Sequence, residues 1–206
     1  MRLTYLHDFE ETVLSGLTLS EALDKIEGFH GSVAPGILIG GLMIDLAQEL
    51  VGDSILYNAV VETPYCLPDA VQIFTPCTMG NNWLKVVDYG RFAVTLYNKD
   101  SGKGIRVWVD LNKLEGFRDV FNWFLKRAPK KELPLDVLLP AILHAGREML
   151  SYRNVRVFDQ AWGVKKGAVG VCPACGESYP VNHGTVCRAC AEGPYYCASE
   201  EQEPLQ

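Results

Sequence analysis

The sequence lacks a basic stripe, a long apolar run and a secretory leader. Charged residues make up 21% of the 206 residues and the net charge is -6, whereas nucleic-acid binding requires clustered lysines and arginines. The longest apolar stretch, Pro35 to Leu46, contains glycines and reaches Asp45 too soon to span a bilayer, which needs about 20 residues. Acidic residues interrupt the N-terminus before any secretory apolar region forms. We therefore expect a cytoplasmic protein with neither nucleic-acid nor membrane partners.

A change in composition near residue 160 divides the chain into two predicted domains. Leu, Val and Ile are frequent before this point, whereas Gly, Cys and Pro are frequent after it. The segment from Gly163 to Gly167 has the composition of a connector. We predict a core domain over residues 1–162 and a small second domain over residues 163–206.

Four of the seven cysteines form two Cys-x-x-Cys pairs in the second domain. Cys172 and Cys175 make the first pair, and Cys187 and Cys190 the second. In a reducing compartment this spacing favours a metal over disulfides, and four thiolates suit tetrahedral zinc. Because four cysteines leave no open coordination position, we predict one structural zinc per chain.

Two other uses of these cysteines remain open. A thioredoxin-type redox motif normally occurs as a single Cys-x-x-Cys pair, and an iron–sulfur centre also takes four cysteines. His183 lies between the pairs and is interpreted as a loop residue, because the four cysteines suffice. Cys197 is a surplus thiol near the C-terminus, and the sequence assigns it no role.

The pattern of the core domain predicts helices first, then a mostly antiparallel run of strands, then helices, which is typical of an α+β fold. The first predicted helix starts at its N-cap Ser20 and stops at Gly28. The other predicted helices are Pro35–Gly52, Asp69–Phe74, Phe117–Lys126 and Leu135–Tyr152. The predicted strands are Ile55–Glu62, Leu84–Val87, Phe92–Tyr97, Ile105–Asp110 and Val155–Phe158. The third and fourth form a hairpin, because both alternate and a polar turn joins them.

Unusual residues gather in three predicted loops of the core domain. The candidates for a catalytic or ligand site are His30, Cys66, Asp69, Cys77 and Thr78. Histidine and thiolate suit zinc or iron, and a thiolate beside a histidine can act as a nucleophile or redox group. Each cysteine can equally be a buried small hydrophobe, and His30 an ordinary hydrogen-bonded histidine.

Four segments in this order resemble the E-subunit family of formylmethanofuran dehydrogenase. They cover residues 29–36, 66–72, 77–82 and 88–91, and the C-terminal cysteine module resembles that of the two-domain members. The resemblance implies a thioredoxin-like α+β core, whose mixed sheet is flanked by helices, and a treble-clef zinc finger. It also implies association with the subunits of a molybdenum or tungsten dehydrogenase, and a homodimer.

The first family motif departs from its usual form His-Gly-His-x-Cys-Pro-Gly. Ser32 replaces the second histidine and Ala34 the cysteine, and neither is a good metal ligand. We expect the core site to bind metal weakly or not at all, leaving a small-ligand pocket walled by the five candidates. His30, Cys66 and Cys77 remain a possible three-ligand set.

Three functions follow from these residues together with what the family resemblance implies. The first is an accessory or binding protein of a molybdenum or tungsten enzyme, with a structural zinc finger. The second is a cysteine- and histidine-dependent redox or metal-dependent enzyme of anaerobic one-carbon metabolism. The third is a regulator whose zinc module binds nucleic acid, which the acidic charge opposes.

Overall fold

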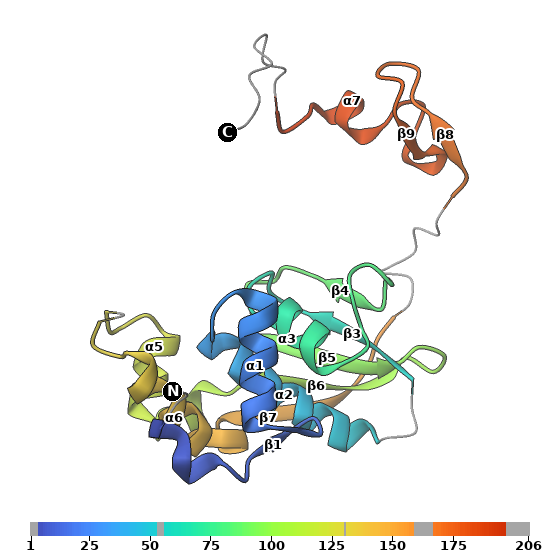
Figure 1. Ribbon diagram of the computed structural model, residues 1–206. Helices are drawn as coiled ribbons and strands as arrows, with labels where there is room; N and C mark the ends of the chain where they lie inside the picture. Colours follow the sequence, from blue (N-terminus) through green and yellow to red (C-terminus); the bar gives the residue numbers. More distant parts are fainter. Residues whose placement is uncertain (1–3, 53–55, 130, 159–166, 197–206) are drawn as a thin grey trace. The chain divides into compact units, whose positions relative to one another are not determined.

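The computed structural model describes residues 4–52, 56–129, 131–158 and 167–196. The chain forms two compact units, Met1–Phe158 and Asp159–Gln206, here called the core domain and the finger (Figure 1). The predicted boundary between residues 162 and 163 lies outside the described residues. A search of the described helices finds none that is long and apolar enough to cross a membrane.

A five-stranded mixed sheet in the order β4-β3-β5-β6-β7 forms the centre of the core domain. Only β3 and β4 are parallel. On β6, Ile105, Val107 and Val109 enter the hydrophobic core while Arg106 and Trp108 take the opposite face, as alternation requires. This sheet and its helices confirm the predicted α+β class. The strands are β3 (Tyr57–Val61), β4 (Leu84–Val86), β5 (Ala93–Asn98), β6 (Lys103–Val109) and β7 (Leu150–Arg156).

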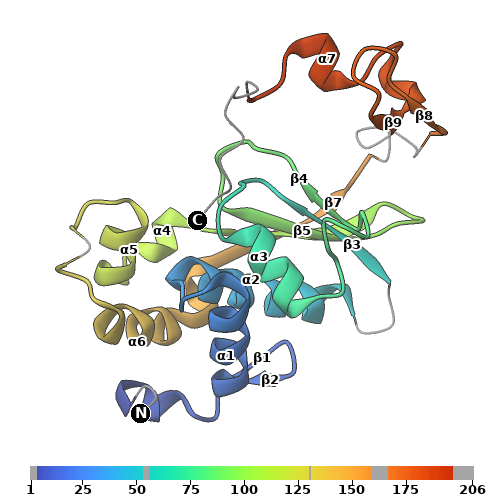
Figure 2. The same cartoon turned by 45° about the horizontal axis from the view of Figure 1, so that its top comes forward.

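The longer helices pack against one face of the sheet (Figure 2). The apolar helix α2 lies on β5 and β6, with α3 and α6 beside it and α1 packed on α2 and α3. A short N-terminal segment and two short helices complete the domain. The bounds are η1 (Thr4–Phe9), β1 (Val13–Leu14), β2 (Leu17–Thr18), α1 (Leu19–His30), α2 (Pro35–Val51), α3 (Leu67–Phe74), α4 (Leu111–Leu114), α5 (Arg118–Phe124), α6 (Leu135–Ala145) and η2 (Gly146–Met149).

The first helix starts and ends at other residues than the sequence suggested. Thr18, not Ser20, is the N-cap, because Thr18 and Glu21 form a reciprocal capping box. The helix also continues past Gly28 to His30, and Gly31 ends it in the left-handed conformation. His30 is therefore the last helical residue and not part of a loop.

The predicted helix Leu135–Tyr152 was wrong in its second half. The helix ends at Ala145, and Gly146 follows with φ 48° and ψ -134°, a conformation that L side chains rarely adopt. Leu150 then pairs with Val109, so the chain continues as β7 along the edge of β6. Pairing with the sheet overrides the helical preference of the local sequence.

Helices α2 and α3 approach each other closely at Gly40. A Cβ atom there would lie 2.5 Å from the Cβ of Ala70 and 3.1 Å from a methyl carbon of Leu67. We expect Gly40→Ala to lower the free energy of unfolding by about 1–3 kcal/mol through overpacking. Adding Ala70→Gly should restore part of it. The measurement is urea denaturation of both variants.

Gly28→Ala is the matched control, since its Cβ would meet nothing within 4 Å. Here alanine's higher helix propensity should raise the stability by up to about 1 kcal/mol. A stabilising Gly40→Ala would show that α2 and α3 are not in this contact.

The finger consists of a small hairpin and one short helix. Strands β8 (Val169–Val171) and β9 (Ser178–Pro180) flank the first Cys-x-x-Cys pair, and η4 (Val181–His183) leads to α7 (Arg188–Glu192). The first Cys-x-x-Cys pair therefore lies in the turn of this hairpin. Tyr179 is buried, and its hydroxyl donates a hydrogen bond to the carbonyl of Gly184 at 3.0 Å.

Candidate functional site

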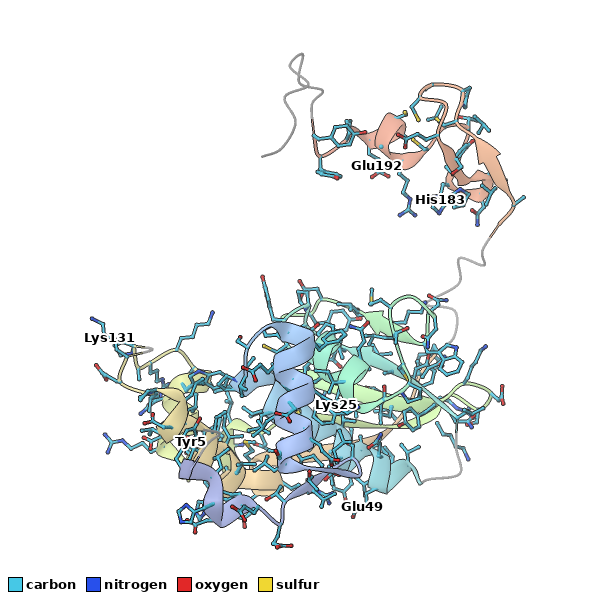
Figure 3. All side chains as sticks on the ribbon, viewed as in Figure 1. Tyr5, Lys25, Glu49, Lys131, His183 and Glu192 are labelled. Carbon is cyan, nitrogen blue, oxygen red and sulfur yellow. The ribbon has the colours of Figure 1, made fainter. Side chains whose placement is uncertain are left out.

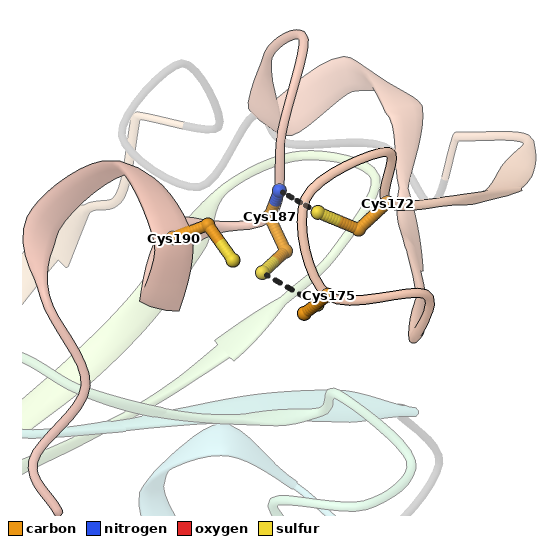
Figure 4. A group of neighbouring side chains, drawn as sticks. All are labelled: Cys172, Cys175, Cys187 and Cys190. Carbon is orange, nitrogen blue, oxygen red and sulfur yellow. Dashed lines mark hydrogen bonds between the residues drawn. The ribbon is translucent and has the colours of Figure 1, made fainter. Parts of the chain in front are cut away.

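The four finger cysteines converge on one point (Figure 4). Cys172 and Cys175 lie in the turn between β8 and β9, whereas Cys187 is the N-cap of α7 and Cys190 lies in its first turn. All four sulfur atoms lie within 4.8 Å of one another. A turn and a helix start thus bring together two pairs that are distant in sequence.

This geometry fits tetrahedral zinc. With a Zn–S bond of about 2.3 Å, neighbouring sulfur atoms of a tetrahedron are about 3.8 Å apart. The Cys175 and Cys187 sulfur atoms are 3.8 Å apart. The backbone amide of Cys187 also donates a hydrogen bond to the Cys172 sulfur at 3.3 Å, which suits a thiolate ligand.

The pKa values of the cluster show why a cation belongs there. Hydrogen bonds from the backbone amides of Cys187 and Cys175 lower the pKa of Cys172 to about 6. The neighbouring sulfurs of Cys187 and Cys175 raise the pKa of Cys190 to about 12. One thiolate is therefore stable alone, but four require a positive ion among them.

In the core domain, His30 and Asp69 form a pair between two helices. The Nδ1 atom of His30, at the end of α1, lies 2.7 Å from the Oδ2 atom of Asp69, in the first turn of α3. Both side chains are about one-third exposed. Cys66 lies at the N-terminal end of the same helix, as its N-cap. Three of the five candidates therefore lie at this end of α3.

The other two candidates lie beyond the C-terminal end of α3. The Cys77 thiol is buried and donates a hydrogen bond to the carbonyl of Tyr57 at 3.3 Å. Thr78 and Asn81 exchange two hydrogen bonds of 3.0 Å that close a turn. These hydrogen bonds stabilise the turn over residues 77–82.

The structure separates the residues of the alternative three-ligand set. Cys66 and Cys77 lie at opposite ends of α3, whose eight residues span about 12 Å. Over the described ranges, the four finger cysteines are the only group of three or more His, Cys, Asp or Glu residues with ligand atoms within 4.8 Å. His30, Cys66 and Cys77 therefore do not form a metal site in this arrangement.

Cys66 occupies a strained backbone turn. Its φ of 57° and ψ of -46° place it in a γ-turn, in which the amide of Leu67 donates to the carbonyl of Tyr65 at 2.5 Å. Burial and then the charge of Asp69 raise the pKa of its thiol. Burial likewise raises the pKa of Cys77. Both groups are therefore thiols and not reactive thiolates at neutral pH.

The Cys66 side chain lines a cleft of about 650 Å³. Three aromatic residues also line it: Phe92 before β5, and Trp123 and Phe124 on α5. The rings of Phe92 and Phe124 meet edge to face at 5.6 Å between centroids. His30, Asp69, Cys77 and Thr78 do not line this cleft, so only Cys66 lies on the wall as predicted.

An ion-pair network around the buried side chain of Glu62 supports one side of the cleft. The carboxylate of Glu62 accepts hydrogen bonds from Arg106 Nε at 2.7 Å and Nη2 at 2.8 Å, and Arg91 Nε lies 2.8 Å from it. The Glu62 carbonyl accepts from the amides of Tyr89 and Arg91, both at 3.1 Å. These contacts hold the loop over residues 88–91, which brings Gly90 to the cleft.

Sequence reasoning missed the aromatic residues and this network. The sequence predicts a helix over Phe117–Lys126 but does not mark its aromatic residues as the wall of a cleft. The only sequence feature that could have indicated the cleft was the number of aromatic residues on so short a helix. No sequence feature indicated that Glu62 pairs with Arg106, because 44 residues separate them.

Comparisons with known proteins bear on both domains. A family model described as FmdE, molybdenum formylmethanofuran dehydrogenase operon, matches residues 29–159, and an FmdE treble-clef zinc-finger model matches residues 163–197. A crystal structure of a tungsten formylmethanofuran dehydrogenase FmdE-like protein from Syntrophus aciditrophicus is 43% identical, with a TM-score of 0.82. The match covers 90% of this chain and 98% of that chain.

A curated protein of Archaeoglobus fulgidus, named a probable S-adenosyl-L-methionine-binding protein, is 35% identical over 202 residues. The match covers 86% of this chain and 54% of that protein, so this chain spans about half the length of the curated relative it matches. The family models match most of the core domain and most of the finger, and the finger has the four cysteines that a treble clef requires. The chain therefore belongs to the FmdE family and carries its treble-clef zinc finger, with a four-cysteine site for zinc.

Proposed function

We propose that this chain is an accessory, ligand-binding protein of a molybdenum or tungsten formylmethanofuran dehydrogenase system. The observation that carries the proposal is the cleft beside Cys66, in a family member that lacks an activated thiolate among its described cysteines outside the finger. Such a cleft suits binding better than covalent catalysis. The protein would act in the cytoplasm, where its thiols stay reduced.

The finger supports a protein-binding part in this function. Val169 and Val171 are each 71% exposed on one face of β8, and Tyr195 is fully exposed. Exposed apolar side chains on a small module are typical of protein contacts. We propose that one structural zinc per chain maintains this surface, and that the chain is a homodimer that also contacts dehydrogenase subunits.

Co-expression with the subunits of such a dehydrogenase tests the accessory function. We expect co-elution in gel filtration at micromolar concentration, and loss of co-elution in a Val169→Asp/Val171→Asp variant that retains zinc. The matched control is Glu177→Gln, an exposed change in the same unit. A parent chain that elutes alone contradicts the proposal. Light scattering at twice the 22.8-kDa chain mass would support the dimer.

S-adenosyl-L-methionine is a candidate ligand, because the curated relative is named for binding it and aromatic rings line the cleft here. Adenine can stack on such rings. Isothermal titration of the parent and of Phe124→Ala would test it. Binding that is unchanged by the substitution would place the ligand elsewhere.

A cysteine- and histidine-dependent enzyme is the second candidate. The His30–Asp69 pair near Cys66 favours it, because a carboxylate orients a histidine in many catalytic sites. Alkylation with iodoacetamide at neutral pH separates the two candidates. The binding protein should show slow alkylation of Cys66, and the enzyme alkylation far faster than that of a free thiol.

A further inference from the structure

Two residues with a strained backbone line the cleft beside Cys66. In the described part of the chain, four residues other than glycine have positive φ: Ser15, Cys66, Asn82 and Lys126. Asn82 is a residue type that tolerates this conformation. Cys66 and Lys126 are 60 residues apart in the sequence, yet both line the same cleft. Strain retained at one cleft by two separate segments indicates a functional site.

Lys126 stands where a glycine would be more stable. The helix α5 ends in a Schellman motif, in which the amide of Arg127 donates to the carbonyl of Asn122 at 2.8 Å and the amide of Lys126 to that of Trp123 at 3.0 Å. The residue after the C-cap of this motif is left-handed and is usually glycine. Lys126 has φ 54° there. Backbone geometry does not explain why this position holds a lysine. We therefore look to the lysine side chain for the reason.

The side chain of Lys126 supplies a free cation at the cleft. Among the described residues, its ammonium has neither an ion pair nor a hydrogen bond, and it is the only charged group that lines the cleft. The nearby carboxylates are occupied: Glu62 by Arg106 and Arg91, and Asp69 by His30. An anion entering the cleft therefore meets one uncompensated positive charge.

The remaining lining suits a planar ring. Trp123 and Phe124 lie with ring centroids 6.5 Å apart, and Phe92 stands edge to face with Phe124. Stacking on such rings is favourable for any aromatic or heteroaromatic group. A cleft of about 650 Å³ has the volume of a small-molecule site.

We propose that this cleft selects a ligand with an aromatic or heteroaromatic ring and an acidic group, in which the ring packs on Trp123 and Phe124 and the acidic group pairs with Lys126. The Cys66 thiol then lies within the same cleft as the ligand. The proposal rests on the ligand-binding part of the proposed function and names the chemical class of that ligand.

Cys66 provides a reporter of what enters the cleft. The probes are dithiobis(nitrobenzoate), an aromatic disulfide with two carboxylates, and dithiodipyridine, a neutral aromatic disulfide. In each reaction the Cys66 thiolate attacks one sulfur, a mixed disulfide forms, the aromatic thiolate leaves, and the Cys66 proton goes to solvent. The rate at Cys66 is followed by peptide mass spectrometry on the zinc-loaded full-length chain.

We expect Lys126→Gln to slow the reaction with dithiobis(nitrobenzoate) about fivefold and to leave that with dithiodipyridine unchanged, because an exposed charge a few ångströms from an anion in water contributes on this order. Lys126→Arg should keep the parent ratio. Lys25→Gln removes the same charge from the exposed surface of α1 (Figure 3) and should also keep it. An unchanged ratio in Lys126→Gln, or an equal loss with both reagents, overturns the proposal.

The variant Lys126→Gly separates the effect of Lys126 on ligand selection from its effect on the stability of the fold. It should raise the melting temperature by about 2–4 °C by relieving the left-handed strain, and should still slow the anionic reagent selectively. A lower melting temperature would mean that Lys126 stabilises the fold, and would overturn the proposal. A failed co-elution with dehydrogenase subunits leaves these rates unaffected, so the accessory function and the ligand class fail separately.

Discussion

Replacing Glu62 by glutamine is expected to lower the free energy of unfolding of the core domain by about 3–5 kcal/mol, the range found when one partner of a buried ion pair is removed. The Glu62 side chain is 9% exposed and that of Arg106 is 18% exposed. Glutamine has nearly the same shape but cannot neutralise the Arg106 guanidinium, which would remain largely buried without its counter-charge. Urea denaturation followed by circular dichroism measures the loss.

Arg91→Ala is the matched control for this pair. Arg91 also bonds Glu62, but its side chain is 58% exposed. Solvent screens such a pair, so we expect a change of about 0–1 kcal/mol. Equal losses for Glu62→Gln and Arg91→Ala would contradict the assignment of the stability to the buried Glu62–Arg106 pair.

The same pair makes the stability of the core domain depend on pH. Burial opposes ionisation of Glu62, but the hydrogen bonds and charges of Arg106 and Arg91 outweigh it and lower the pKa of Glu62 below its usual value of 4.5. A lowered pKa means that the stabilisation is complete above about pH 4.5, the usual value that the unfolded chain retains, and is lost as the pH falls through the folded-state pKa. The difference between parent and Glu62→Gln should therefore shrink below about pH 4.

Removing the zinc is expected to unfold the finger and to leave the core domain folded. Of the described finger residues, only Cys172 and Tyr179 are buried, so this unit has almost no hydrophobic core. Metal binding then supplies its folding free energy, on the order of 10 kcal/mol at neutral pH. Hydrogen exchange should show loss of amide protection in residues 167–196 on chelation, with unchanged protection in β5 and β6.

Metal content gives the second measurement of this prediction. Elemental mass spectrometry should find one zinc per chain in the parent and none in Cys172→Ser/Cys187→Ser, while the control Cys66→Ser keeps its zinc. Acid should also release the metal, because protons compete with zinc for thiolates. Protected finger amides in the metal-free protein, or a second metal that survives in the double variant, would contradict the prediction.

Sequence reasoning was accurate where the deciding interactions are local. The Cys-x-x-Cys spacing places two sulfurs in one turn, and the hairpin of β5 and β6 follows from alternation on either side of a polar turn. The predicted helix Leu135–Tyr152 was wrong from the point where the chain pairs with a strand distant in sequence, since Leu150 pairs with Val109. The N-cap of α1 was missed by two residues because Thr18 and Ser20 are both good caps, and only the reciprocal Glu21 contact separates them.

The sequence by itself determined the zinc ligands, the α+β class and the membership of the family, because these depend on spacing, periodicity and motif order. Only the tertiary structure decided that Cys66 and Cys77 lie at opposite ends of α3 and that Cys66 shares a cleft with Trp123, Phe124 and Lys126. Contacts between residues this far apart arise from sheet register and helix packing. A register shift of one residue would turn Arg106 to the other face of the sheet, away from Glu62, and no local pattern specifies that choice.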